Sequence, residues 1–285
     1  MLTLARGAAT LVIDPDHGAR AASLLVHGLE LLGRGGDDPV QWGWYPMAPW
    51  PGRLRGNIVR GADGAEHALR PTFQGWAMHG TVLARAWAVE TAEANAATLV
   101  CALGPDWPWP GEVRQTWSLG EGWLDCSLEV VAAGEHAYPV ELGWHPWFRR
   151  TLDRGGSAQV LLDAVRQVER GSDHLPTGRL APVGQRALTA GYDDGFQVPS
   201  GQAAITWPGA LALTCASDCE WFTVFSELPD TVCVEPQTAP ADALAASPRL
   251  RPGETRSARS RWAWRLLSDA PIGPGPHRAD GAHSA

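Results

Sequence analysis

The sequence contains no lysine, so all 23 of its basic residues are arginines. This absence excludes enzymes that form a lysine Schiff base or that use lysine as the acid or base. Acidic residues number 31, which gives a net charge of 23 − 31 = −8. A moderately acidic chain without a basic cluster is not typical of proteins that bind nucleic acid or anionic membranes, so we expect neither partner.

Long apolar runs and a cysteine framework are also missing. No 18 residues in a row are apolar, and Arg6 and Asp14 interrupt the opening MLTLARGAATLVID, so we expect no membrane span and no signal peptide. The five cysteines are odd in number and irregularly spaced, which suits a reducing compartment. Cys215 and Cys219 lack a second pair to complete a zinc site. We therefore expect a cytoplasmic protein.

Turn-forming residues and tryptophan are abundant, with 32 glycines, 23 prolines and 15 tryptophans. Between the turns lie short alternating segments, such as LDCSLEV at 124–130, VRQTWSL at 113–119 and RWAWRLL at 261–267. Alternation with a period of two predicts antiparallel strands, and many such strands in one chain predict an all-β sandwich or barrel. Most of the tryptophans should fill its core, and some could stack on a sugar ring.

Two segments depart from this pattern. AQVLLDAVRQVER at 158–170 carries apolar residues at helical spacing, so its periodicity alone predicts a helix. Residues 269–285 are rich in Gly, Pro and Ala without apolar periodicity, which predicts a disordered tail after a domain of residues 1–268.

Candidate reactive groups are few. Glu235 follows an apolar stretch in VCVEPQTAPADAL, and we expect Pro236 to end the hydrogen-bond ladder of that strand. Most glutamates in such a place are solvated strand ends. His145 lies among aromatic residues in ELGWHPWF, and His79 precedes a glycine in WAMHGTV. A lone histidine among apolar residues is more often a satisfied core residue than a reagent. A histidine against two tryptophans, in a chain that also ends a strand with Glu235 and Pro236, lowers those odds.

Three further polar residues suit sugar hydroxyls. Arg53 follows the turn APWPG and offers a planar set of donors, although an arginine there is usually a surface residue. Asp193 and Asp194 in YDDGF are most simply turn residues, and either could accept hydrogen bonds from a substrate. His79, His145 and Glu235 could in principle ligate a metal, but their wide spacing in separate motifs argues against one, so we expect no metal and no cofactor.

The ordered set of motifs resembles one family. APWPGRLRGNIVRGADG, MHGTVLARAW, PVELGWHPWFR, HLPTG, YDDGF and VCVEPQTAPADAL occur in this order over roughly residues 11–267. The set is similar to the aldose 1-epimerase (mutarotase) family and its wider galactose mutarotase-like group. The resemblance implies a large antiparallel β-sandwich with a sugar cleft across one sheet. It also implies that segment 158–170 is extended rather than helical, and we follow it over the periodicity.

The resemblance also implies roles for particular residues. The family's general acid matches His145, its general base matches Glu235, and its sugar-binding Arg, His and Asp match Arg53, His79 and Asp193. The family commonly has an asparagine before the arginine, and this chain has Gly52 there. One donor and acceptor to the sugar is therefore missing, which would cost about 0.5–1.5 kcal/mol if nothing replaces it.

These roles give a mechanism and its alternatives. Glu235 would take the anomeric hydroxyl proton while His145 protonates the ring oxygen, and unperturbed pKa values of about 4.3 and 6.5 would let a carboxylate and a part-protonated imidazole coexist near neutrality. We expect an aldose 1-epimerase, either a monomer or a homodimer. The alternatives are a phosphosugar (hexose-6-phosphate) 1-epimerase and a non-catalytic carbohydrate-binding protein. A glycoside hydrolase usually needs two flanking carboxylates and fits less well.

Overall fold

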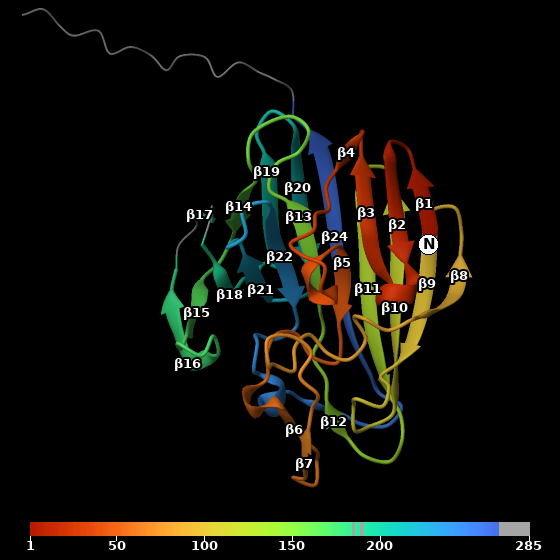
Figure 1. Ribbon diagram of the computed structural model, residues 1–285, viewed down its shortest axis with the longest axis vertical. Coiled ribbons are helices and arrows are strands. Elements are labelled where there is room, and N and C mark those ends of the chain that lie inside the picture. Colours follow the sequence, from red (N-terminus) through yellow and green to blue (C-terminus); the bar gives the residue numbers. More distant parts are fainter. Residues whose placement is uncertain (184–185, 189–190, 268–285) are drawn as a thin grey trace, which may run out of the picture.

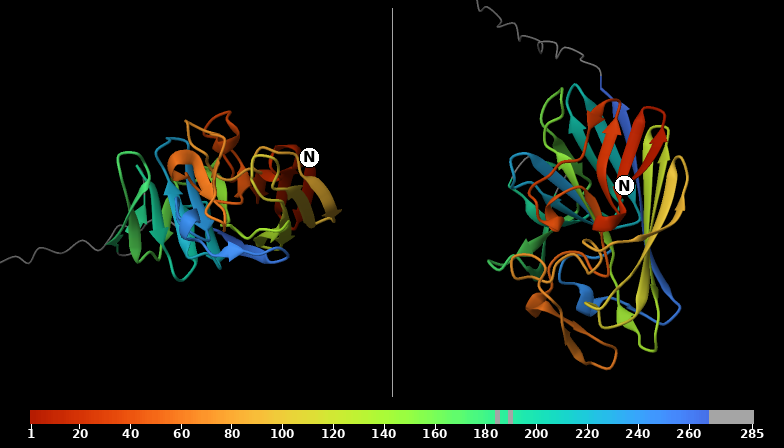
Figure 2. Two further views of the ribbon diagram at one scale, coloured as in Figure 1. Left: turned by 90° about the horizontal axis from the view of Figure 1, so that it is seen from below. Right: turned by 45° about the vertical axis from the view of Figure 1, so that its right-hand side comes forward.

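Strands make up most of the regular structure in residues 1–183, 186–188 and 191–267, which are the residues that the computed structural model describes. All pairings between the strands are antiparallel. They form two large sheets that pack face to face (Figures 1 and 2). The predicted all-β antiparallel sandwich is therefore confirmed. The predicted disordered tail, 269–285, lies outside the described residues.

The first large sheet has 11 strands and carries the candidate site. In spatial order its strands are β1 (Leu2–Arg6), β2 (Ala9–Asp14), β3 (Arg20–Val26), β5 (Trp44–Met47), β13 (Gly143–Arg149), β22 (Thr231–Gln237), β21 (Trp221–Phe225), β18 (Asp193–Gln197), β15 (Arg166–Arg170) and β16 (Pro176–Pro182), with β4 (Leu29–Glu30) paired to β3.

The second large sheet has nine strands. In spatial order they are β17 (Arg186–Leu188), β14 (Gln159–Leu162), β19 (Gln202–Trp207), β20 (Leu211–Ser217), β24 (Thr255–Leu266), β11 (Trp123–Ala132), β10 (Gly111–Gly120), β9 (Ala96–Ala102) and β8 (Ala88–Ala92). Two small sheets pair β12 (Tyr138–Pro139) with β23 (Arg249–Leu250) and β6 (Ile58–Arg60) with β7 (Glu66–Ala68).

Short 3₁₀ turns are the other regular elements in the described part of the chain. They are η1 (Pro15–His17), η2 (Pro39–Gln41), η3 (Arg55–Asn57) and η4 (Leu244–Ala246). None of the helices among the described residues has the length and apolar character needed to cross a bilayer.

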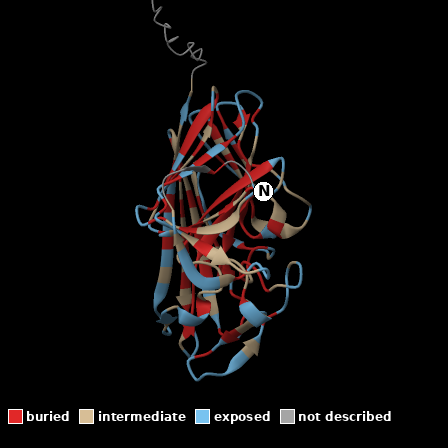
Figure 3. Cartoon of the chain, turned by 90° about the vertical axis from the view of Figure 1, so that its left-hand side faces the viewer, coloured by how far each residue is buried: buried red, intermediate tan, exposed pale blue. Residues whose placement is uncertain are grey.

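The space between the two sheets is filled by apolar residues, among them many aromatic ones, and Figure 3 shows that the central strands are buried. Trp44 of the first sheet meets Trp117 and Trp262 of the second edge-on, with ring centroids 5.5 and 5.1 Å apart. The predicted alternation holds in β10 and β11, where buried and partly exposed side chains alternate. The buried set is apolar except for Gln115, whose amide donates to the Ala19 carbonyl. Most of the tryptophans thus fill the core, as the sequence predicts.

Segment 158–170 is extended, so the resemblance predicts it correctly and the helical periodicity does not. Its two halves form β14 and β15, which belong to different sheets. Leu161 and Val165, which a helix would have buried, are each 46 % exposed. Val160 and Leu162 are buried instead, because alternate side chains of β14 face the core.

Both faces of the first sheet are covered near its centre. Along β13 and β22 the even-numbered residues, such as Phe148 and Val234, join the core between the sheets. The odd-numbered residues face the other way, and Trp147 and Cys233 belong to a second, smaller apolar cluster. Because a strand alternates its side chains, one strand pair serves a core and a separate cleft.

The expectation that Pro236 ends the ladder is wrong. β22 continues to Gln237, and Pro236 lies opposite Phe222 of β21. On the other side, the pairs Gly143–Gln237 and Trp147–Cys233 bracket the proline without a ladder bridge between them. The missing N–H is therefore accommodated at a local gap between β13 and β22, and Glu235 lies within a central strand.

A close backbone approach beside the cleft predicts a stability difference. Gly80 has a φ of +81°, and a Cβ there would lie 1.8 Å from the Ala48 carbonyl oxygen. Gly75 has a φ of +82° but nothing within 4 Å of its would-be Cβ, so it is a matched control. Gly75→Ala should cost about 1–2 kcal/mol of unfolding free energy from the left-handed backbone alone. Gly80→Ala should cost roughly 1–3 kcal/mol more from the clash. Urea denaturation of both variants measures this, and equal losses would contradict the close approach.

Candidate active site

A cavity of about 330 Å³ opens above the first sheet, on the face that turns away from the core. This volume is typical of small-molecule sites. Its floor is formed by side chains of β13, β22, β21, β18 and β15, and its walls by the loops that carry Arg53, His79 and Ala241 and by the turn η2. Its lining includes all five residues that the sequence assigns to a site: Arg53, His79, His145, Asp193 and Glu235.

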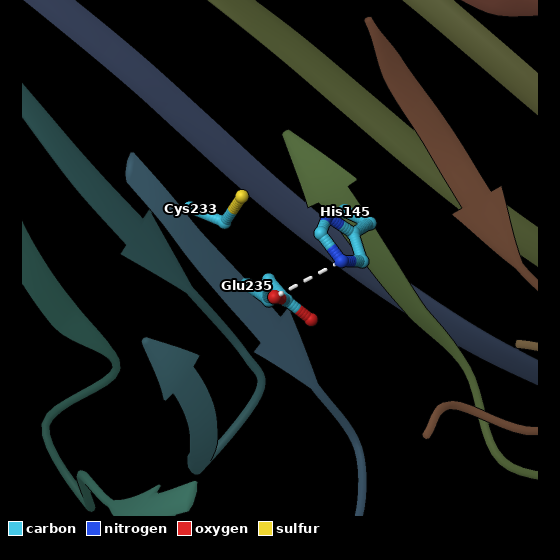
Figure 4. Close-up of side chains that lie close together, drawn as sticks. All are labelled: His145, Cys233 and Glu235. Atoms are coloured by element: carbon cyan, nitrogen blue, oxygen red, sulfur yellow. Dashed lines mark ion pairs between the residues drawn. The ribbon is translucent and has the colours of Figure 1, made fainter. Parts of the chain in front are cut away.

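His145 and Glu235 form a buried pair at the floor of this cavity (Figure 4). The register that joins Gly143 to Gln237 and Trp147 to Cys233 places His145 directly across from Glu235. Their side chains lie on the same face of the sheet, and His145 Nε2 is 3.3 Å from Glu235 Oε1. The imidazole and the carboxyl are only 8 % and 2 % exposed. The structure thus brings together the two residues predicted to act as acid and base.

Burial shifts the pKa values of this pair in opposite directions. Removal from water raises the pKa of the Glu235 carboxyl well above 4.5, and the charge of Asp193 raises it further, while the Gln237 amide and Arg53 lower it in part. Burial lowers the pKa of His145 well below 6.5, with His79 and Arg20 acting in the same direction. The expectation of unperturbed values is wrong, because it ignores this loss of solvation.

Gln237 is a functional candidate that the sequence analysis missed. Its amide nitrogen donates to Glu235 Oε2 at 3.2 Å and to Thr223 Oγ1 at 3.0 Å. It therefore steadies the carboxylate oxygen that does not face His145. The signal was available in the sequence, because Gln237 lies two residues after Glu235 and residues i and i+2 of a strand share a face.

Arg53 and Asp193 meet in an ion-pair network at the side of the cavity. Asp193 Oδ2 lies 3.5 Å from Arg53 Nη1 and 2.7 Å from Arg170 Nη1. Arg170 Nε also donates to Asp194 Oδ1 at 3.0 Å. Asp193 and Asp194 are thus not turn residues: they begin strand β18. Sequence reasoning missed Arg170, since only the pairing of β15 with β18 reveals its place.

His79 is held in place by its backbone and its ring. Its N–H donates to the Gly52 carbonyl at 3.0 Å, and its Nδ1 accepts from the Gly52 N–H at 3.2 Å. That acceptor role puts the ring proton on Nε2. Burial, with a contribution from Arg53, lowers the pKa of His79 to about 3, so the ring is a neutral donor at physiological pH.

Gly52 does more than omit a side chain. Its φ is +70°, and a Cβ there would lie 2.5 Å from the Ala241 Cβ. Ala241 lines the same cavity, so it takes up space that a side chain at position 52 would need. Position 52 therefore lacks a polar side chain, and the methyl group of Ala241 on the facing loop occupies the space that such a side chain would need.

Cys233 brings a third potential ligand close to the pair. Donor atoms of His145, Cys233 and Glu235 all lie within 4.8 Å of one another (Figure 4). The donor types suit zinc, but a zinc ligand must be a thiolate. Burial raises the pKa of Cys233 well above its usual value, and the carboxylates of Glu235 and Asp193 raise it further. Because these groups favour the thiol, we interpret the cluster as an acid–base pair beside a neutral Cys233.

Two tryptophans line the cavity, and the sequence could not single them out. They are Trp147 of β13 and Trp76 of a wall loop. Trp147 is buried and Trp76 is partly exposed. Because both line the cavity, both present apolar surface to a ligand. Aromatic faces of this kind suit the apolar C–H face of a sugar ring.

Comparisons with known proteins identify the family and the fold. A family model described as aldose 1-epimerase matches residues 1–262. A solved structure from Escherichia coli K12, described as a candidate aldose 1-epimerase, is 20% identical with a TM-score of 0.82, covering 93% of this chain and 99% of that chain. A galactose mutarotase-like protein from Clostridium acetobutylicum is 15% identical with a TM-score of 0.80, covering 93% and 95%. Galactose 1-epimerase from Lactobacillus acidophilus NCFM is 16% identical with a TM-score of 0.76, covering 93% of each chain. At these identities the structural likeness shows the fold. Curated proteins gave no match.

The contact between Gly52 and Ala241 predicts coupled stability effects. Gly52→Asn alone should be destabilising by roughly 1–3 kcal/mol, because the new side chain meets the Ala241 methyl. Adding Ala241→Gly should recover part of that loss, although Ala241→Gly alone should not stabilise the protein. A double-mutant cycle from thermal or urea unfolding measures the coupling. Additive effects of the two substitutions would show that the side chains do not compete for one space.

Proposed function

The chain belongs to the aldose 1-epimerase family, and we propose that it interconverts the α and β anomers of a free aldose. The observation that carries the proposal is the separation of 3.3 Å between His145 Nε2 and Glu235 Oε1 at the floor of the cavity. An acid and a base so close together can act on two oxygens attached to the same carbon. The anomeric carbon of a cyclic sugar bears such a pair, namely its hydroxyl and the ring oxygen.

The reaction needs one proton removed and one proton supplied. The Glu235 carboxylate accepts the proton of the anomeric hydroxyl, and protonated His145 donates to the ring oxygen. The bond between C1 and the ring oxygen breaks, and C1 becomes the carbonyl carbon of the free aldehyde. After rotation about the C1–C2 bond the ring oxygen attacks the other face of C1. The two residues then reverse roles, so that no net proton is gained or lost.

The opposed pKa shifts define the working protonation state. Burial favours the neutral form of each group, so the resting pair holds one proton mainly on Glu235. Moving that proton to His145 creates the reactive carboxylate and imidazolium, a charge pair that the site stabilises in low dielectric surroundings. The pair therefore titrates as a unit, with pKa values that belong to both residues together.

The remaining site residues bind and orient the sugar in this proposal. Neutral His79 donates from Nε2, Arg53 donates from its guanidinium, and Asp193 accepts hydroxyl protons. Arg53 Nε supports this role, because it is buried and finds no partner among the described residues. Trp147 and Trp76 offer apolar surface to the ring.

A free sugar fits these charges better than a phosphosugar. A phosphate needs arginines that are free to bind it. Arg53 and Arg170 already face Asp193, and Arg170 also faces Asp194. Nearby Arg55 faces Asp173 and Asp242. A phosphorylated ligand would have to compete with these carboxylates.

The proposal also covers the cofactor requirement, the location and the oligomeric state of the enzyme. Acid and base are both side chains of this chain, so the reaction as proposed uses no cofactor. We place the protein in the cytoplasm and take it as a monomer or homodimer with a small sugar as its substrate. The support for this location is that all five cysteines are free and buried, which suits a reducing compartment.

Replacing the base tests the function directly. Glu235→Gln should keep the fold, because burial already favours a neutral group there, and should lower kcat/KM by about 10²–10⁴-fold. Polarimetry on fresh α-D-glucose, α-D-galactose and a pentose measures the rate over the spontaneous one. Glu227→Gln is the control, since Glu227 lines the same cavity and is exposed.

Three results would contradict the proposal in different ways. An unchanged rate in Glu235→Gln would remove Glu235 from the reaction. If the wild-type protein accelerates no free sugar but does accelerate sugar phosphates, the phosphosugar alternative is correct. If it binds sugars without any acceleration, it is a carbohydrate-binding protein.

The pH profile of kcat/KM should reflect the shifted pair. A lowered His145 pKa moves the acid limb below pH 6.5, and a raised Glu235 pKa moves the basic limb well above pH 4.5. The proton lost on the basic limb should therefore come mainly from the Glu235 carboxyl and not from an imidazole. His79, with a pKa of about 3, and Tyr45 and Cys233, with raised pKa values, do not titrate near neutral pH. If NMR titration shows the His145 ring losing its proton along the basic limb, that limb belongs to His145 and the assignment to Glu235 is wrong.

A further inference from the structure

The His145 ring has few polar contacts to fix it. Its Nε2 faces Glu235, while its Nδ1 is buried and has no hydrogen-bond partner among the described residues. A catalytic histidine is usually oriented by a hydrogen bond on the nitrogen that faces away from the reaction. Here another interaction must set the ring plane.

Two aromatic rings stack against the imidazole. The Tyr45 ring has its centroid 5.0 Å away and its plane at 27°. The Trp147 ring has its centroid 5.1 Å away and its plane at 11°. Tyr45 lies across from His145 in the neighbouring strand, and Trp147 lies two residues further along β13, so the three side chains share one face of the sheet. The imidazole plane is therefore set by packing against these two neighbouring rings.

Both stacked rings are tied to one atom. The Tyr45 hydroxyl donates to the Val40 carbonyl oxygen at 2.9 Å, and Trp147 Nε1 donates to the same oxygen at 3.0 Å. A carbonyl oxygen has two lone pairs, so one acceptor can serve both donors. The Val40 carbonyl thus fixes the positions of the two rings that stack against His145 relative to each other.

A buried arginine fixes the turn that carries this carbonyl. Arg20 Nη1 donates to the carbonyls of Pro39 at 2.7 Å and Trp42 at 2.9 Å, on either side of Val40. Arg20 is fully buried, and its guanidinium carbon lies 5.0 Å from the centre of the Tyr45 ring. Burial lowers its pKa only to about 10, so it stays charged at physiological pH and holds these carbonyls with charge-assisted hydrogen bonds.

We propose that Tyr45 and Trp147, anchored on the Val40 carbonyl and supported by Arg20, are positioning residues that hold the His145 imidazole in its reactive orientation. This inference rests on the proposed function, because it explains how the proposed acid keeps Nε2 directed at the reacting atoms. The rings also keep water away from the imidazole. Tyr45 does not line the cavity and acts through His145 alone, whereas Trp147 also presents apolar surface to the cavity.

A matched pair of substitutions separates positioning from general stability. Tyr138, like Tyr45, is fully buried, and its hydroxyl donates to a backbone carbonyl, that of Pro110, at 2.7 Å. Tyr138 belongs to β12 and does not line the cavity. Tyr45→Phe and Tyr138→Phe therefore each remove one hydroxyl-to-carbonyl hydrogen bond and keep the ring.

Kinetics of the two variants give the first readout. Tyr45→Phe should lower kcat about tenfold, since small displacements of a catalytic group cost up to roughly 10²-fold, and should leave KM within about twofold. Tyr138→Phe should leave both unchanged. Equal kcat values for the two variants would overturn the proposal. So would a change in Tyr45→Phe that is confined to KM, since that would assign Tyr45 to sugar binding.

The NMR signals of the His145 ring give a second readout that does not depend on activity. Imidazole carbon-bound protons this close to two aromatic rings should carry a ring-current shift, and loosening of the packing in Tyr45→Phe should change that shift. Tyr138→Phe should leave it unchanged. If the wild type accelerates no sugar but the shift responds as expected, the proposed function fails and the positioning of the ring stands. An unchanged shift in Tyr45→Phe overturns that positioning.

If Tyr45→Phe does not fold, a second pair of substitutions, at two tryptophans, tests the same proposal. Trp147→Phe removes the second donor to Val40, and Trp207→Phe removes an equivalent bond, from Nε1 to the Arg149 carbonyl at 3.0 Å in the second sheet. The His145 signals should move in Trp147→Phe by more than in Trp207→Phe. Equal responses would overturn the proposal.

Discussion

Loss of solvation at His145 and Glu235 is the constraint on which the site depends. Two ionisable groups held nearly dry are costly, and the cost falls when they share one proton and each keeps a polar contact. Gln237 supplies such a contact to Glu235. Tyr45 and Trp147 exclude water from the imidazole by packing against it. The loss of solvation that favours the neutral forms of both groups would also strengthen the interaction between the charges formed in the proposed ring opening.

The centre of the first sheet must therefore serve two environments at once. In β13 and β22, one set of alternate residues packs into the core between the sheets, and the other set forms the floor of the cleft. The core holds the strands in register, and the register sets the distance between His145 and Glu235. A slip of one residue in this pairing would turn one of the two proposed catalytic groups into the core. Rigid packing on the core face of β13 and β22 therefore holds His145 and Glu235 at their distance on the cavity face.

Sequence predicted the parts of this arrangement that follow from local pattern or from motif. Alternation predicted β10 and β11, and motif order identified the five residues that now line one cavity. Residues that depend on cross-strand neighbours could not be predicted. Arg170 reaches Asp193 only because β15 pairs with β18, and Val40 meets Trp147 across more than 100 positions of chain. The helical spacing in 158–170 gave a wrong prediction for the same reason. The two halves of this segment pair with strands of different sheets, which the local spacing does not reveal. Pro236 and the pKa shifts depend on burial, which no single motif reveals.

The position of β24 has a consequence for how the protein is made. This strand follows every other described strand in sequence, yet it lies inside the second sheet, between β20 and β11 (Figure 1). Until residues 255–266 leave the ribosome, that sheet exists as two halves with unpaired edges on β11 and β20. Those edges are open to pairing with other nascent chains or to binding by chaperones. Folding of this sandwich therefore finishes only after nearly all of its described residues have been synthesised.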